Sequence, residues 1–453
     1  MFIISFKILE QFVESSRYVI YTNSKVLFSS KLKKIFKTFG PGVITGAADD
    51  DPSGIATYSQ TGAQFGYGQL WTAVFMLPFQ AGVQEACARI GAVTGKGIAA
   101  VVKQHYSRKI LYAVVVLVLV ANTINIGADI GAMAAAAALI VPVNFVILTL
   151  VFTISILLLE IFTSYKVYSK ILKWLCLSLF AYPVTVFIVA QPWGTLLKAT
   201  FIPHIELNFQ FLFIIVGVLG TTISPYMFFW QASEETEEER LNHLIGKNGK
   251  PAISWKFIKN LRIDNFIGML FSEVGTWSII VVTATVLNSH GFTDIKTAAD
   301  AAKALEPLVS SFPNAGYLAK LLFAVGVIGL GLLSIPVLAG SAAYAFTEAF
   351  NLNEGLNLRL KKAHGFYGVI TIATLIGLMI NFIGINPIKA LVFAAVINGV
   401  VAVPLIFIIA LIAGNGKIMG QYKSGPLSKA LVWMTFIGMG AAAIGMFLTL
   451  RGL

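Results

Sequence analysis

Three consecutive aspartates, Asp49, Asp50 and Asp51, stand inside an apolar stretch near the start of the chain. Pro52 and Gly54 follow them closely. Because proline lacks an N–H donor and clashes with the preceding turn, we expect the helix to break here. Consecutive residues of an intact helix point about 100° apart, so only a break lets neighbouring carboxylates face one site. The pattern predicts a cation site at the middle of a membrane span.

Three further acids stand within apolar stretches, at Glu85, Asp129 and Glu273. Ionisable groups at membrane depth are costly and usually mark function. No Lys or Arg stands deep in these stretches, since Arg89 falls at the end of one of them. The sequence therefore predicts no buried ion pair. Each deep acid is expected to be protonated, hydrated or paired with a mobile cation.

The composition indicates an integral membrane protein. Charged residues make up 12% of the 453 residues and the hydrophobic set 57%, whereas a soluble domain carries roughly 25% charged residues. This excludes a disordered chain, a disulfide scaffold and a nucleic-acid binder. Stretches of about 18 or more apolar residues predict transmembrane helices. The eleven predicted spans are 40–66, 69–92, 110–141, 144–165, 170–191, 210–233, 264–288, 317–347, 366–385, 389–412 and 427–450.

The basic residues predict the orientation of these spans. Of the 33 Lys and Arg residues, 26 fall on one side of the predicted topology, and such loops are cytoplasmic. We expect a multi-pass plasma-membrane protein with a basic cytoplasmic segment at 1–39 and an extracytoplasmic C-terminus. The acidic run Glu234–Glu239 is interpreted as a solvated loop. Residues 293–307 are predicted to form a short helix on the outer surface.

A second break is predicted in the sixth span, where Gly220 is followed by Pro225. Broken helices in matching positions of two halves are typical of transporters with inverted repeats. The spans then divide into a first repeat, 40–191, a second inverted repeat, 210–412, and an added helix, 427–450. The predicted fold class is an all-α integral membrane protein with broken helices 1 and 6.

Residues 40–68 read GPGVITGAADDDPSGIATYSQTGAQFGYG, and 88–97 read ARIGAVTGKG. Together with Asp129, the Thr-x-x-Pro break at Pro225 and LAGSAAYAF at 338–346, they resemble the Nramp family of divalent metal transporters. The resemblance implies the LeuT-like fold of two inverted five-helix repeats. It also implies a metal site made by the Asp and Asn of the first motif, with a Met and a backbone carbonyl from helix 6.

The metal ligands depart from the family pattern. The motif Asp is kept as Asp51, but Gly54 stands at the Asn position and Ser224 at the Met position. Asp49 and Asp50 replace residues that are usually uncharged. Since thioether sulfur favours transition metals, its loss predicts a harder site built from oxygen ligands, suited to Mg²⁺ or Mn²⁺. In this respect the chain is similar to the Nramp-related magnesium transporter branch.

The family's proton route is also incomplete here. Tyr226 and Gln231 stand where the family has histidines, and Ala132 stands where helix 3 often carries a Glu. We therefore predict import of divalent cations by alternating access without strict proton coupling.

The predicted site residues fall into two groups. Asp51 is the expected carboxylate ligand, and Gly54 leaves room for a hydrated ion. The remaining metal-site candidates are Ala48, Thr221, Ser224, Asp49, Asp50 and Asn398. The candidates for a polar or proton path are Asp129, Glu85, Gln231, Tyr226, Asn122, Asn125 and Glu273.

Several alternatives stay open. One is a proton-coupled Mn²⁺/Fe²⁺ transporter, as in typical Nramp proteins. Another is a sodium-coupled amino acid symporter of the same fold, which three acids beside the site disfavour. An intramembrane aspartyl hydrolase would need Asp51 and Asp129 to meet as a dyad, and a metal sensor would need an extra soluble domain. We expect no enzymatic activity and no cofactor. The expected partners are the transported divalent cation and the lipid bilayer, with no nucleic acid and no obligate protein partner.

Overall fold

The computed structural model describes residues 41–163, 180–241, 244 and 251–450. The predicted segment 1–39 lies outside these residues, as does the first half of the span at 170–191. Within the described part, seven helices are long and apolar enough to cross a membrane. They are Arg108–Ala137, Phe145–Phe162, Phe209–Leu241, Trp255–His290, Ala315–Phe350, Pro387–Gly414 and Pro426–Leu450.

Helices lie at the positions of all the predicted spans, with only α10 described for the fifth. In chain order the main helices are α3 (Pro41–Asp49), α4 (Pro52–Phe65), α5 (Trp71–Thr94), α6 (Ile98–His105), α7 (Arg108–Ala137), α8 (Phe145–Phe162), α10 (Ala181–Ile188), α11 (Trp193–Phe201), α12 (Phe209–Thr222), α13 (Pro225–Leu241), α14 (Trp255–Val286), α16 (Ala315–Phe350), α17 (His364–Ile380), α18 (Pro387–Gly414), α19 (Gly416–Met419) and α20 (Pro426–Leu450).

Both predicted helix breaks are confirmed. The first span divides into α3 and α4, and Asp51 adopts an extended backbone at the N-cap of α4 (φ −65°, ψ 172°). Pro52 occupies the first turn of α4, where its missing N–H costs nothing. The sixth span divides after Thr222, and Pro225 begins α13. In both spans the helix is therefore interrupted next to a proline, which begins the second half-helix.

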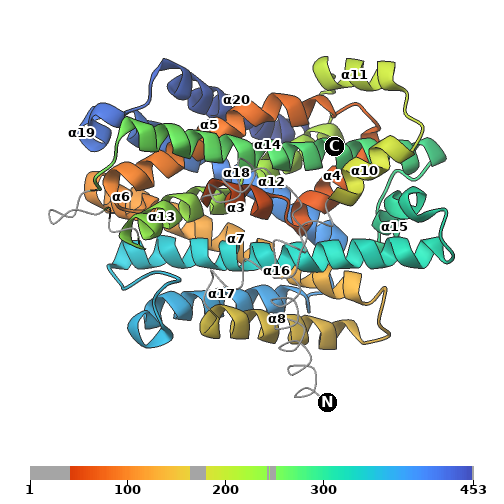
Figure 1. The fold of residues 1–453 in the computed structure, drawn as a ribbon, viewed down its shortest axis with the longest axis horizontal. Coiled ribbons are helices and arrows are strands. Elements are labelled where there is room, and N and C mark those ends of the chain that lie inside the picture. The colour runs from red at the N-terminus through yellow and green to blue at the C-terminus, as the bar shows by residue number, and fades with distance from the viewer. Residues whose placement is uncertain (1–40, 164–179, 242–243, 245–250, 451–453) are drawn as a thin grey trace, which may run out of the picture. The chain divides into compact units, whose positions relative to one another are not determined.

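The two broken helices lie against each other in the interior. The half-helix α3 contacts α13, and α4 contacts α12. α14 runs along both α3 and α4, while α7 packs on α16, α17 and α18. In Figure 1, α3 is seen between the long helices α14 and α16, and α8 lies beside α17.

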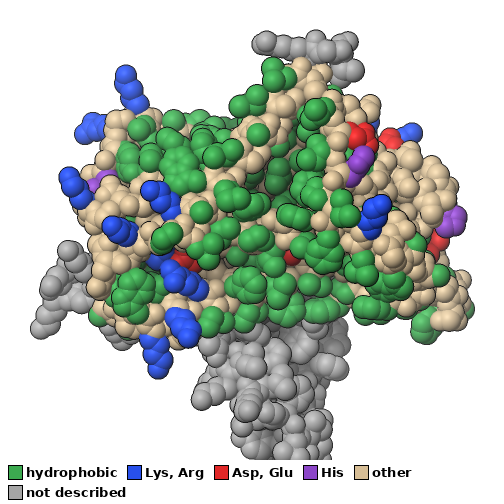
Figure 2. All heavy atoms as spheres, turned by 90° about the horizontal axis from the view of Figure 1, so that it is seen from above, with side chains coloured by type: hydrophobic (Ala, Val, Ile, Leu, Met, Phe, Trp, Pro, Cys, Tyr) green, Lys and Arg blue, Asp and Glu red, His purple; other side chains and the backbone are tan. Residues whose placement is uncertain are grey.

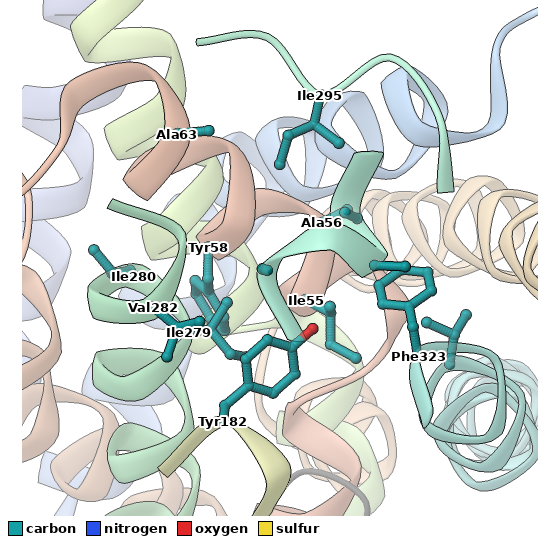
Figure 3. Packing of buried hydrophobic residues seen from close by; sticks show 14 of the residues in the cluster. Ile55, Ala56, Tyr58, Ala63, Tyr182, Ile279, Ile280, Val282, Ile295 and Phe323 are labelled. Atoms are coloured by element: carbon teal, nitrogen blue, oxygen red, sulfur yellow. The ribbon is translucent and has the colours of Figure 1, made fainter. Parts of the chain in front are cut away.

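Apolar packing holds α4 in place on three sides. Ile55 and Ala56 of α4 belong to one buried cluster with Ile280 of α14 and Phe323 of α16. Figure 3 shows Ile295, from the segment before α15 (Ala298–Ala302), covering the same helix. These contacts position the N-terminus of α4, which carries Asp51.

The short helix predicted within 293–307 is confirmed as α15 with the 3₁₀ helix η3 (Lys303–Val309). Thr297 and Asp300 form a capping box that starts it. The interpretation of Glu234–Glu239 as a solvated loop is wrong, because this run is the end of α13. Glu237 is buried there and accepts hydrogen bonds from Tyr344 and from the Leu356 N–H.

The surface is apolar in the way a membrane protein requires. Phe187, Leu207 and Ile383 are exposed by 78%, 82% and 69%, which water would penalise and lipid does not. Figure 2 shows hydrophobic side chains across the middle of one face, with Lys and Arg gathered at the end where α6 and α19 lie. The pattern is that of a bilayer-spanning belt with one basic end.

A glycine contact sets the distance between α3 and α14. A Cβ atom on Gly46 would lie 2.3 Å from the carbonyl oxygen of Gly268. We expect Gly46→Ala to force the helices apart and to destabilise the protein by roughly 1–3 kcal/mol. Gly438→Ala is the matched control, because nothing lies within 4 Å of a Cβ atom there. Thermal unfolding in detergent should show a lower midpoint for Gly46→Ala alone, and equal midpoints would contradict the prediction.

Candidate functional site

The Asp51 carboxylate is the centre of a buried polar network. Its Oδ1 accepts hydrogen bonds from the Ser53 hydroxyl at 2.6 Å and from the Gly54 N–H at 2.8 Å. Its Oδ2 accepts one from the Asn125 amide of α7 at 2.9 Å. The side chain has no solvent exposure, so the site is closed in this structure. An anionic group at a helix N-terminus is favoured by the free N–H groups there.

Asn125 connects this carboxylate to two other helices. Its side-chain oxygen accepts a hydrogen bond from Asn398 of α18 at 2.8 Å. Its amide also lies 3.3 Å from the Asp129 carboxylate, which the Ser334 hydroxyl of α16 contacts at 3.2 Å. Asp51, Asn398 and Asp129 are therefore brought together around one asparagine. The Asn398 oxygen has no hydrogen-bond partner among the described residues, and it is free to accept one or to bind a cation.

The helix 6 break forms the opposite side of the site. The Thr221 hydroxyl lies 3.5 Å from Asp51 Oδ1 and 3.3 Å from the Ser53 hydroxyl. The Ser224 hydroxyl instead donates to the carbonyl groups of Gly220 and Thr221, both at 2.7 Å. Ser224 thus secures the end of α12, and Thr221 is the α12 side chain that reaches Asp51.

Tyr226 joins the two breaks. Its hydroxyl donates to the Ala48 carbonyl oxygen at 3.1 Å, which ties the end of α3 to the start of α13. At Gly54, a Cβ atom would lie 3.2 Å from both the Thr221 hydroxyl and the Tyr58 ring. A glycine at this position keeps the space beside Asp51 clear.

Asp49 and Asp50 point away from this centre. Asp49 accepts short hydrogen bonds from Gln80 of α5 and Ser272 of α14, and Asp50 lies 3.3 Å from the same Ser272 hydroxyl. In the described part of the chain, no three His, Cys, Asp or Glu side chains converge closely enough to hold a metal ion. A cation at Asp51 would therefore be bound by one carboxylate together with carbonyl, amide and hydroxyl oxygens.

Glu85 corrects the expectation that the deep acids lack ion pairs. Its carboxylate accepts from Arg89 at 2.8 Å and from Arg262 at 2.9 Å. Arg89 is completely buried and also donates to the Tyr422 carbonyl and the Ser424 hydroxyl. The expectation failed for two reasons. Arg89 lies one helical turn after Glu85 on α5, and the packing of α14 against α5 places Arg262 beside the same carboxylate. The structure makes Glu85 part of a structural ion-pair cluster.

Gln231 lies in a different part of the interior from Asp51. Its side-chain oxygen accepts from Thr45 at 2.5 Å, and its amide donates to Glu235 at 2.8 Å. Asn122 donates to the Leu338 carbonyl at 2.9 Å, which is a helix–helix contact. Among the described residues, neither side chain is hydrogen-bonded to Asp51 or Asn125.

Three residues that bond the aspartates were not predicted as part of the metal site from the sequence. Asn125 appeared only as a path candidate, although its spacing of four from Asp129 places both on one face of α7. Ser272 and Gln80 carried no signal, because polar residues of these types are common between membrane helices. Their role depends on α5 and α14 packing beside α3.

Comparisons with known proteins place the chain in a family. The sequence model described as Natural resistance-associated macrophage protein-like (Nramp) matches residues 42–449. The divalent metal cation transporter MntH of Caldanaerobacter subterraneus is 25% identical over 429 residues, covering 93% of this chain and 95% of that protein. MntH of Klebsiella pneumoniae is 26% identical over 402 residues, covering 87% and 89%.

Solved structures agree on the fold. A crystal structure of the Eremococcus coleocola manganese transporter matches with a TM-score of 0.72 at 16% identity, covering 93% of this chain and 87% of that one. The structure of MhsT in complex with L-phenylalanine matches with a TM-score of 0.56 at 12% identity, covering 90% and 98%. The predicted class, an all-α membrane protein with the LeuT-like fold, is confirmed. With the family model matching nearly the whole chain, this protein belongs to the Nramp family.

Proposed function

We propose that this protein imports hard divalent cations, Mg²⁺ or Mn²⁺, through a site at the breaks of helices 1 and 6. As an Nramp family member it is a divalent metal cation transporter and not an enzyme, in line with the names of its MntH relatives. The observation that carries the proposal is the buried Asp51 carboxylate at the N-terminus of α4, which contacts the Asn125 amide of α7 and the Thr221 hydroxyl of α12, with Asn398 of α18 bonded to Asn125.

The proposed ligands are hard. They are the Asp51 carboxylate, the Thr221 hydroxyl, the Ala48 carbonyl and the Asn398 side-chain oxygen, with Gly54 leaving room for retained waters. Mg²⁺ keeps several waters and binds through one or two carboxylates, and Mn²⁺ accepts the same ligands. Met227 follows the break closely, but it packs in an apolar cluster with Ala48 and Trp230. This supports a site without thioether sulfur.

The energetics fit transport without strict proton coupling. Gln231 cannot carry a proton at neutral pH, and its amide is bonded to Glu235. A divalent cation moving inward across 100 mV gains about 4.6 kcal/mol, twice the value for a unit charge. The membrane potential and the metal gradient therefore suffice to drive uptake.

We place the protein in the plasma membrane with its N-terminus in the cytoplasm and its C-terminus outside. The end of the described molecule that is rich in Lys and Arg (Figure 2) would face the cytoplasm. The helices of 40–191 and 210–412 would form the two inverted repeats, and 427–450 the added helix.

The test is uptake into proteoliposomes loaded with a pH indicator. We expect Mg²⁺ and Mn²⁺ to enter under an inside-negative potential, with no acidification that scales with metal influx. Acidification in proportion to influx would instead establish a proton-coupled transporter. Mn²⁺ or Fe²⁺ uptake with Mg²⁺ excluded would overturn the assignment of a hard-ion site. Competition by amino acids would favour the symporter alternative.

A further inference from the structure

We propose that a second cation site lies between α3 and α14, formed by the carboxylates of Asp49, Asp50 and Glu273. The proposal rests on the proposed function, because the ion would be the transported divalent cation. It adds a binding position whose hydrogen bonds run to α5 and α14 and not to the Asp51 network.

Close helix packing brings the three acids together. α3 approaches α14 at the contact of Gly46 with Gly268. About two turns further along α14, a Cβ atom on Gly275 would lie 2.9 Å from Asp50 Oδ2, so the missing side chain lets the Asp50 carboxylate reach α14. Glu273 directly follows Ser272 in α14, and its carboxylate is close enough for its charge to act on Asp49 and Asp50. Asp49 and Asp50 therefore meet at Ser272, and Glu273 lies next to that serine on α14.

The hydrogen bonds around Ser272 leave carboxylate oxygens without partners. Ser272 donates to Asp49 and lies 3.3 Å from Asp50. Among the described residues, neither oxygen of Glu273 has a hydrogen-bond partner, and Asp49 Oδ1 also lacks one. Asp49, Asp50 and Glu273 are only 0%, 2% and 4% exposed. Buried carboxylates left in this way are strongly unfavourable unless a cation or protons join them.

A partly hydrated divalent ion fits these groups best. The available ligands are hard oxygens. They are the three carboxylates and the Gln80 side-chain oxygen, which belongs to the amide that bonds Asp49 and has no partner among the described residues. Since no three acidic side chains in the described part of the chain converge to hold a bare ion, the ion would keep waters between itself and some of the carboxylates. Mg²⁺ and Mn²⁺ bind in this manner.

The second site is connected to the helix 6 break. The Gln80 amide donates both to Asp49 and to the Thr222 carbonyl oxygen, the latter at 2.9 Å. Thr222 is the last residue of α12. An ion held by Asp49, Asp50 and Glu273 would therefore lie beside the same two broken helices that carry Asp51. We assign it as a staging position for an ion that enters or leaves the Asp51 site.

The test is to count bound ions on the purified full-length protein. Free Mn²⁺ is measured by electron paramagnetic resonance during titration with Mn²⁺ alone, so that the difference gives the number bound per chain. We expect two for the wild type, one for Glu273→Gln and one for Asp51→Asn. Affinity for the lost ion should fall roughly tenfold or more. The double variant should bind none.

Glu160→Gln is the matched control. Glu160 of α8 is also buried, and its carboxylate oxygens have no hydrogen-bond partner among the described residues. It should still bind two ions. Asp49→Asn serves as the second variant, with one ion expected, if Glu273→Gln does not give a monodisperse protein.

The outcomes separate this inference from the proposed function. One ion in the wild type that Glu273→Gln retains and Asp51→Asn loses would remove the second site, with the acids then holding protons, and would leave the proposed function intact. Two ions in both the wild type and Glu273→Gln would also overturn the second site. Failure of Asp51→Asn to change any binding or uptake would count against the proposed function itself.

Discussion

Asp51→Asn is expected to abolish uptake of Mg²⁺ and Mn²⁺ while leaving the protein folded. Asn caps a helix about as well as Asp, so the N-cap of α4 is preserved. The variant removes the charge of the carboxylate that accepts from the Asn125 amide and lies beside the Thr221 hydroxyl. Loss of an outer partner of a metal ligand typically costs roughly 10–100-fold in affinity or activity, and loss of the charged ligand itself should exceed that. Initial rates of metal uptake into proteoliposomes measure the effect.

Two controls make this prediction specific. Asp51→Ala should lose uptake equally and, lacking the cap, should also lose about 1 kcal/mol of stability. Glu160→Gln removes another buried carboxylate, far along the chain in α8, and should transport like the wild type. Wild-type uptake by Asp51→Asn would show that the charge of Asp51 is not needed and that another group binds the ion.

Arg89→Ala is expected to produce the largest loss of stability. The Arg89 guanidinium is fully buried and bonded to Glu85, to the Tyr422 carbonyl and to the Ser424 and Ser428 hydroxyls. Its removal leaves the buried Glu85 carboxylate with Arg262 as its remaining cation. Breaking a buried pair from one side typically costs about 3–5 kcal/mol. It would also loosen α20, which reaches α5 through these contacts.

Arg262→Ala provides the comparison for Arg89→Ala. The Arg262 side chain is 46% exposed, and a partly exposed pair contributes at most about 1 kcal/mol. Thermal unfolding followed by size-exclusion chromatography should therefore give a much lower midpoint for Arg89→Ala than for Arg262→Ala. Similar midpoints for the two variants would contradict the assignment of Arg89 as the structural centre of the cluster.

The sequence alone determined where the two helices break, and it predicted the spans and singled out Asp51 as the expected ligand. These features are local. Apolar length decides whether a segment spans a bilayer, and Pro52 and Pro225 interrupt their own helices whatever surrounds them. Once helix 1 breaks at Asp51, that carboxylate becomes the N-cap of α4.

Only the tertiary structure decided which partner each of the other polar groups contacts. Asn125 and Asn398 are 273 residues apart and meet because α7 packs against α18. Asp49 and Asp50 adjoin Asp51 in the chain but bond to Ser272, more than 220 residues away. Arg262 comes 177 residues after Glu85 and still pairs with it.

The physical reason is the membrane interior. Buried polar groups in lipid must find partners within the protein, and which partner each one reaches depends on helices that pack together from distant parts of the chain. Residue types and local breaks therefore predicted that a cation site exists and where it is centred. Packing of α14 against α3 decided that two of the three aspartates contact Ser272 and not the Asp51 network.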